Sequence, residues 1–131
     1  MSIMVAYDGT EAAKGALDLA KAHAKAFKTE IEVVQAADKG EDLVYPDVEK
    51  LEKKLEKEIK KLMNDEDIPF KTTLLVSSDT AGEQITRHLE LKNSSEICMG
   101  VRRRSKVGKL LSGSTAQYVI LNAPCPVVTT R

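Results

Sequence analysis

The feature that most constrains the fold is the regular alternation of short apolar runs with longer amphipathic segments. The runs are rich in β-branched residues and end at turn residues, which is typical of buried strands. The longer segments repeat apolar residues every three or four positions, which predicts helices. We therefore expect strands over 2–7, 31–37, 70–76, 95–101 and 126–130, separated by helices over 10–27, 47–63, 79–92 and 114–122.

Five strands alternating with four helices predict an α/β protein. Neighbouring parallel strands need a crossover connection, and the crossover helices cover both faces of the sheet. Such crossovers are right-handed. Because no linker or internal repeat divides the chain, we expect residues 1–131 to form a single domain. Its architecture is expected to be a three-layer α/β/α sandwich around a five-stranded parallel sheet.

The helical patterns also predict which side chains face the sheet. The Thr10 hydroxyl is expected to cap the first helix. The short apolar seam of the second helix is more typical of packing on a sheet than of a coiled coil. The inward-facing residues are expected to be Ala13, Ala16, Leu17, Ala20, Ala24 and Phe27 in the first helix, Val48, Leu51, Leu55, Ile59 and Leu62 in the second, and Ile85 and Leu89 in the third.

Composition narrows the classes of partner. The 131 residues carry 20 acidic and 20 basic side chains, so no net charge draws the protein to nucleic acid or to a membrane surface. The apolar runs are shorter than a membrane helix needs, and we expect a cytoplasmic protein. Cys98 and Cys125 lack metal-type spacing, so small buried thiols are expected.

One basic stretch, "GVRRRSKVGKLLSGST" at 100–115, lies where α/β proteins bind ligands. It follows the fourth strand, and ligands bind at the carboxyl ends of parallel strands. Gly113, Ser114 and Thr115 precede a helix whose free N–H groups and dipole favour an anion. The alternative to an anion-binding site is an ordinary helix cap next to a loop whose basic side chains are exposed to solvent. The stretch lacks the aromatic residues typical of single-strand nucleic-acid binding and the spacing of a Walker loop.

The whole chain resembles the universal stress protein family. The resemblance lies in "IMVAYDGTEAA" at the first strand and loop, and in "ICMGVRRRS" followed by "LLSGSTAQYVILNAPCPVV" in the C-terminal half. It implies a Rossmann-like fold, similar to the adenine nucleotide alpha hydrolases, with strand order 3-2-1-4-5. It also implies a homodimer formed by antiparallel pairing of the fifth strands. The family includes members that bind ATP and members that do not.

The ATP-binding members carry the motif Gly-x2-Gly-x9-Gly-Ser/Thr. Gly100, Gly113 and Ser114 match this motif, whereas Arg103 stands at the second glycine. An arginine there either strains the loop and fills the site, or contacts phosphate with its guanidinium. The resemblance implies that nucleotide contacts come from Ala6, Tyr7, Asp8, Ala36, Met99, Gly100, Arg102, Arg103, Gly113, Ser114 and Thr115, with Asp8 able to share a magnesium ion.

These observations favour a dimeric, ATP-binding stress-response regulator. The alternatives are a nucleotide-free protein that acts on an unknown protein partner, and a weak ATPase. We expect no catalytic set, since His23 and His88 fall within helices, on their solvent or flank faces, with no nucleophile beside them. The expected dimer interface is the apolar edge strand, which comprises Pro126, Val127, Val128 and Thr129.

Overall fold

A computed structural model describes residues 1–37, 45–64, 67–101 and 113–131. Strands and helices alternate along the chain, in the predicted order and within a few residues of the predicted bounds. The elements are β1 (Ser2–Ala6), α1 (Glu11–Phe27), β2 (Glu30–Ala36), α2 (Tyr45–Leu62), β3 (Phe70–Leu75), α3 (Ala81–Lys92), β4 (Glu96–Gly100), α4 (Ser114–Asn122) and β5 (Val127–Thr130).

All five strands form one parallel sheet with the order β3-β2-β1-β4-β5. Both the α/β fold and this strand order confirm the expectation. The strand order reverses at β1, because β2 pairs with one of its edges and β4 with the other. The carboxyl ends of β1, β2 and β4 therefore lie together, at the place where α/β folds bind ligands.

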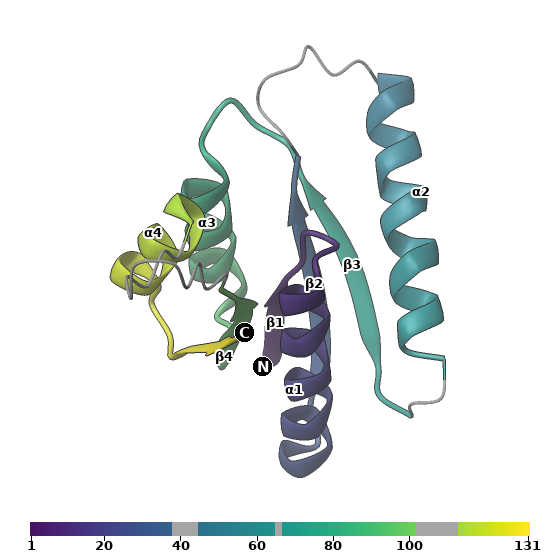
Figure 1. Ribbon diagram of the computed structural model, residues 1–131, viewed down its shortest axis with the longest axis vertical. Coiled ribbons are helices and arrows are strands. Elements are labelled where there is room, and N and C mark those ends of the chain that lie inside the picture. Colours follow the sequence, from purple (N-terminus) through teal and green to yellow (C-terminus); the bar gives the residue numbers. More distant parts are fainter. Residues whose placement is uncertain (38–44, 65–66, 102–112) are drawn as a thin grey trace, which may run out of the picture.

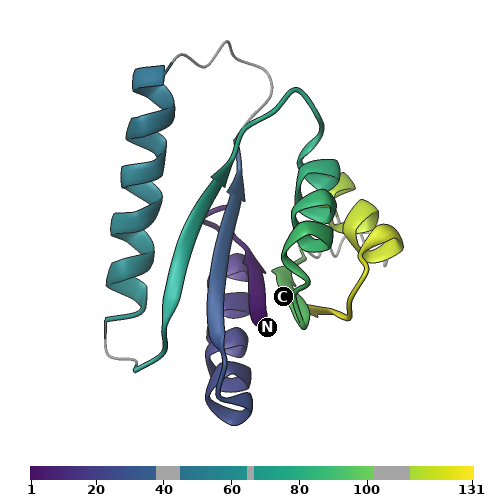
Figure 2. The same ribbon diagram turned by 180° about the vertical axis from the view of Figure 1, so that it is seen from behind.

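Helices cover both faces of the sheet (Figures 1 and 2). On one face, α1 and α2 pack over the odd-numbered residues of β1, including Ile3 and Val5. On the other face, α3 and α4 pack over Met4 and its neighbours. Among the described residues, no helix is long and apolar enough to cross a bilayer.

Helices α1 and α3 begin with side-chain caps. The Thr10 hydroxyl accepts a hydrogen bond from Ala13 N at 3.2 Å, as predicted. Thr80 and Glu83 form a reciprocal capping box at the start of α3. Helix α4 differs, because Gly113 occupies its N-cap position and offers no side chain to the first turn.

The predicted inner faces are largely correct, with one clear error. The five alanine and leucine positions of α1 are buried, whereas Phe27 is 65% exposed. Phe27 is the last residue of α1, and the chain then turns at Lys28 with a φ of 53°. Its ring therefore packs beside His23, at a centroid distance of 5.7 Å, instead of against the sheet.

In α2, Leu55 and Ile59 are buried, while Val48, Leu51 and Leu62 are only partly covered. Met63, just beyond the helix, completes this part of the core. Ile85 and Leu89 of α3 are buried, as predicted. Both thiols are free, and Cys98 is fully buried, whereas Cys125 is only partly covered.

Candidate functional site

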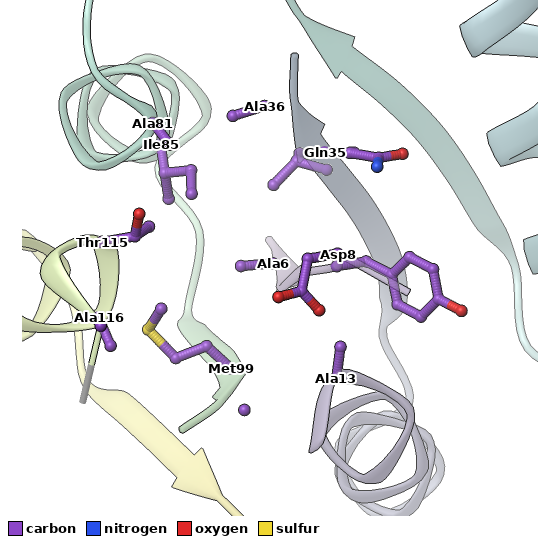
Figure 3. Close-up of a pocket in the computed structure, with 14 residues that line it drawn as sticks. Ala6, Asp8, Ala13, Gln35, Ala36, Ala81, Ile85, Met99, Thr115 and Ala116 are labelled. Atoms are coloured by element: carbon purple, nitrogen blue, oxygen red, sulfur yellow. The ribbon is translucent and has the colours of Figure 1, made fainter. Parts of the chain in front are cut away.

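A cavity of about 510 Å³ lies at the carboxyl ends of β1, β2 and β4. Helices α3 and α4 form its opposite wall, with Ile85 facing Ala6 and Met99 across the space (Figure 3). Aliphatic side chains therefore dominate its walls. Its volume falls within the range of roughly 300 to 1,000 Å³ that is usual for small-molecule sites.

The loop after β1 brings a carboxylate to this cavity. Asp8 is exposed, and Figure 3 shows its carboxylate directed into the space between Ala6, Ala13 and Met99. Asp8 Oδ1 accepts hydrogen bonds from Thr10 N at 3.0 Å and from Thr10 Oγ1 at 2.6 Å. Gly9 turns the chain with a φ of 84°. The same threonine thus orients Asp8 and caps α1.

The first turn of α4 forms another part of the cavity wall. Gly113, Thr115 and Ala116 line it. Gly113 has an ordinary φ of −59°, and a Cβ built on it would meet no atom of the described residues within 4 Å. Because no side chain in the described part of the chain caps this helix, its first N–H groups are free to bind a ligand as far as those residues are concerned. The arrangement suits an anion.

The carboxyl end of β2 presents backbone to the cavity. Tyr7 N donates to Val34 O at 2.9 Å, so Val34 directs its backbone groups toward β1. By strand alternation, Ala36 directs its N–H and C=O toward the same side. Among the described residues these two groups have no partner there, because β1 has already ended and the chain has turned at Asp8.

Gly100, the first glycine of the motif, also lines the cavity, and packing within the fold explains why a glycine stands there. A Cβ at this position would come within 2.4 Å of Ala12 C and 2.6 Å of Ala12 O. Such distances are too short for any side chain. The glycine is therefore required by the close approach of β4 to the first turn of α1, whatever the cavity holds.

Most of the predicted site residues meet at this one cavity. Eight of them line it, namely Ala6, Tyr7, Asp8, Ala36, Met99, Gly100, Gly113 and Thr115. The Tyr7 side chain, however, is buried in the core under α1 and α2, where burial raises the pKa of its phenol. Ser114 is exposed and does not line the cavity. Arg102 and Arg103 lie outside the described residues.

Sequence reasoning missed six further lining residues: Ala13, Val34, Gln35, Ala81, Ile85 and Ala116. Most are small or aliphatic, and no motif marks them. Only their positions in the predicted elements could have indicated them: Ala81 and Ala116 lie in the first turns of helices that start at this edge of the sheet. Val34 and Gln35 lie at the end of β2, next to the predicted Ala36.

The expected solvent or flank position is wrong for His88, whereas His23 lies at the flank of α1 and is 31% exposed. His88 is only 12% exposed, and its Nε2 donates to Glu32 Oε2 at 2.8 Å. His23 Nδ1 lies 2.9 Å from Glu96 Oε1. Both glutamates occupy buried strand positions, because helices cover both faces of the sheet. These pairs lie away from the residues that line the cavity.

The comparisons with known proteins agree with the fold. The family model described as "Universal stress protein family" matches residues 1–131. The chain belongs to the universal stress protein family. A universal stress protein of Thermus aquaticus is 34% identical over 135 residues, which cover 99% of this chain and 98% of that protein.

Solved structures of the family superimpose on the whole of this universal stress protein. A universal stress protein from Archaeoglobus fulgidus has a TM-score of 0.83 and 25% identity, and the alignment covers 100% of this chain and 93% of that one. A second structure from the same organism, solved in complex with dAMP, has a TM-score of 0.81 and 23% identity, and covers 100% and 98%.

Proposed function

We propose that this protein is a dimeric stress-response regulator that binds an adenine nucleotide, with ATP as the expected ligand. The observation that carries the proposal is the uncapped start of α4, which faces the Asp8 carboxylate across an apolar cavity of about 510 Å³. The complex of an Archaeoglobus fulgidus relative with dAMP supports the same ligand class.

The base is proposed to lie between the end of β2 and the aliphatic side chains of the opposite wall. Toward β1, the backbone donor and acceptor of Ala36 have no partner among the residues that the structure describes, and adenine offers a matching acceptor and an exocyclic amine. Ile85 and Met99 would cover the faces of the ring. This backbone edge therefore offers a donor and an acceptor at fixed positions to a ligand that hydrogen-bonds to it.

The phosphates are proposed to lie at the start of α4, where Gly113 leaves room and Thr115 lines the cavity. Backbone N–H groups and the helix dipole both favour negative charge there. Ser114 is not one of the residues that line the cavity, but it is the first residue of α4 and is proposed to contact phosphate there. Asp8 fits a magnesium role, because its carboxylate is exposed and faces the cavity, and oxygen ligands suit this ion.

The experiment is calorimetric titration of nucleotide-stripped protein with ATP and magnesium, alongside AMP and adenosine. We expect ATP to bind, and adenosine to bind at least about tenfold more weakly, because it lacks the group that the α4 N-terminus attracts. An absence of binding at millimolar ATP would contradict the proposal. Equal affinity for adenosine and ATP would contradict the placement of the phosphates.

Gly113→Val provides the site-specific variant. Its φ of −59° and the empty surroundings mean that valine costs the fold little, but the side chain would fill the space proposed for phosphate. Binding should be lost while thermal stability is unchanged. Ser78→Val, at an exposed position outside the cavity, is the matched control and should bind normally.

Arg103, at the second motif glycine, favours the nucleotide-free alternative, in which the dimer acts only through protein contacts. Arg103→Gly separates the possibilities. If Arg103 only restricts the loop, the variant should bind ATP as well as or better than the parent chain. A large loss of affinity would instead identify Arg103 as a phosphate ligand.

A further inference from the structure

Three metal-binding side chains converge on the face of the sheet beneath α1, away from the nucleotide cavity. Glu96 and Cys98 lie two residues apart on β4, so their side chains point to the same face. His23 reaches them from α1, which packs on that face. Among the residues the structure describes, this is the one group of three such side chains close enough to share an ion.

The geometry brings the ligand atoms within reach of one ion. His23 Nδ1 lies 2.9 Å from Glu96 Oε1 and 3.0 Å from Oε2. Cys98 Sγ lies 3.8 Å from Glu96 Oε2, and the three ligand atoms all lie within 4.8 Å of one another. Tetrahedral zinc, with bonds of about 2.0 to 2.3 Å, separates its ligands by roughly 3.3 to 3.8 Å. Small side-chain rotations are enough to reach these separations.

The charge of the cluster also suits a divalent ion. Cys98 is fully buried and the Glu96 side chain is 9% exposed, so an isolated thiolate and carboxylate there would be costly. A dication bound to one thiolate, one carboxylate and one neutral imidazole is electrically neutral. The ion therefore removes the unfavourable charge instead of adding to it.

We propose that His23, Glu96 and Cys98 bind a zinc ion. Mixed thiolate, imidazole and carboxylate ligands favour zinc over magnesium or calcium, which prefer oxygen ligands alone. The protein supplies three ligands, and water supplies the fourth. His23 is 31% exposed, so its side of the cluster gives the ion a route from solvent.

Binding exchanges protons for the ion. In the metal-free protein, His23 and Glu96 are hydrogen-bonded to each other, and Cys98 carries its thiol proton. Zinc replaces the His23–Glu96 hydrogen bond: His23 gives up the Nδ1 proton to solvent and holds its one remaining N–H proton at Nε2, so the ligand is the neutral imidazole. The Cys98 thiol proton is released to the buffer because the thiolate is the ligand. Calorimetry in two buffers of different ionisation enthalpy should therefore show proton release on zinc binding.

Cobalt(II) is the spectroscopic probe, applied to the full-length protein after treatment with a chelator. We expect visible bands of a tetrahedral site and a sulfur-to-cobalt charge-transfer band in the near ultraviolet, both abolished by stoichiometric zinc. Cys98→Ser should remove the charge-transfer band. His23→Gln should weaken cobalt binding at least about 10- to 100-fold, the range known for changes outside the direct ligand set.

The chain offers matched controls. Cys125→Ser removes the other thiol, and His88→Gln removes the other histidine. Both should keep the full cobalt spectrum. The proposal is overturned if cobalt gives no charge-transfer band, if the band survives Cys98→Ser, or if Cys125→Ser abolishes it. If Cys98→Ser fails to fold by circular dichroism, His23→Gln decides, and an unchanged cobalt affinity in that variant overturns the proposal.

Discussion

Replacing His88 with leucine should destabilise the fold strongly, because it leaves a buried carboxylate short of a partner. Glu32 is 1% exposed, and its Oε2 accepts hydrogen bonds from His88 Nε2 and Thr73 Oγ1, each at 2.8 Å. Its Oε1 has no partner among the described residues. Among the described residues, the buried carboxylate is therefore stabilised by two hydrogen bonds, both accepted by the same oxygen.

The magnitude follows from this burial. Leaving a buried carboxylate short of one of its two hydrogen-bond donors costs about 3 kcal/mol or more, above the usual cost for an uncharged polar group. His88 is 12% exposed, so some water reaches the gap and the lower end, about 3 kcal/mol, is expected. That is a large share of the roughly 5 to 15 kcal/mol that stabilises a typical domain. With a urea m-value of about 1.5 kcal/mol per M, the unfolding midpoint should fall by about 2 M.

A double-mutant cycle tests the reasoning. Glu32→Leu with His88→Leu removes both hydrogen-bonded polar groups and fills the space with apolar atoms, so the double variant should cost much less than the two single changes together. Urea unfolding followed by circular dichroism gives the four free energies. A His88→Leu change below about 0.5 kcal/mol, or additive costs across the cycle, would refute this account.

The same pair predicts a pH dependence. Burial alone raises the pKa of Glu32, but the hydrogen bonds from His88 and Thr73 outweigh it, and the pKa is lowered from its usual value of 4.5. A depressed carboxyl pKa stabilises the fold above the unfolded value, and this contribution is lost as the pH falls through the folded value. Stability should drop below about pH 4.5 more steeply in the parent chain than in the double leucine variant.

Three further changes follow from particular contacts. Gly100→Ala should lower the free energy of unfolding, measured with urea, by about 2 to 3 kcal/mol, because its Cβ would overlap the Ala12 backbone. Gly113→Ala is the control and should change it by less than about 0.5 kcal/mol. Equal effects of the two changes would contradict the packing explanation. Thr10→Ala should lose about 1 kcal/mol with the α1 cap, and an unchanged melting temperature would count against that cap. Thr129→Pro removes a backbone N–H that β5 directs away from β4, and in a two-fold dimer each protomer loses one such hydrogen bond, two in total. The dimer dissociation constant, measured by ultracentrifugation, should therefore rise about 30-fold or more. An unchanged mass would reject this edge as the interface.

Thr129 is a sharper test of the dimer than the valines beside it. Val127 and Val128 pack against the two cores of this same chain, so charges there would also damage the fold. Ile97 N donates to Pro126 O and Val101 N to Thr130 O, so by alternation Thr129 directs its backbone away from β4. Thr129→Val keeps that N–H and serves as the control.

The sequence predicted the elements well because strand and helix periodicities are local. The β-branched runs and the three-to-four spacing survive in the structure almost residue for residue, and Thr10 and Gly113 begin α1 and α4 as expected. The strand order came from the family resemblance, since periodicity does not specify which strands become neighbours.

The buried glutamates could not be predicted in the same way. Glu32 alternates with apolar residues, which in an antiparallel sheet would indicate a solvent face, and Glu96 is the first residue of its strand, where exposure is common. In a parallel sheet covered on both faces, each instead meets a helix, and the histidine opposite it lies many residues away in sequence. The tight approach of Gly100 to Ala12 is equally non-local, and a glycine motif carries no sign of it.

The close contact between Gly100 and Ala12 has a mechanical consequence for the cavity. At this contact β4 packs directly on the backbone of the first turn of α1, so no side chain separates these two elements on one side of the cavity. On the other side, Gly82 allows α3 to pack equally closely on Tyr118 of α4. We therefore expect α3 and α4 to move together when the cavity changes in width, so a ligand that contacts both sides would alter the position of these two helices at the protein surface.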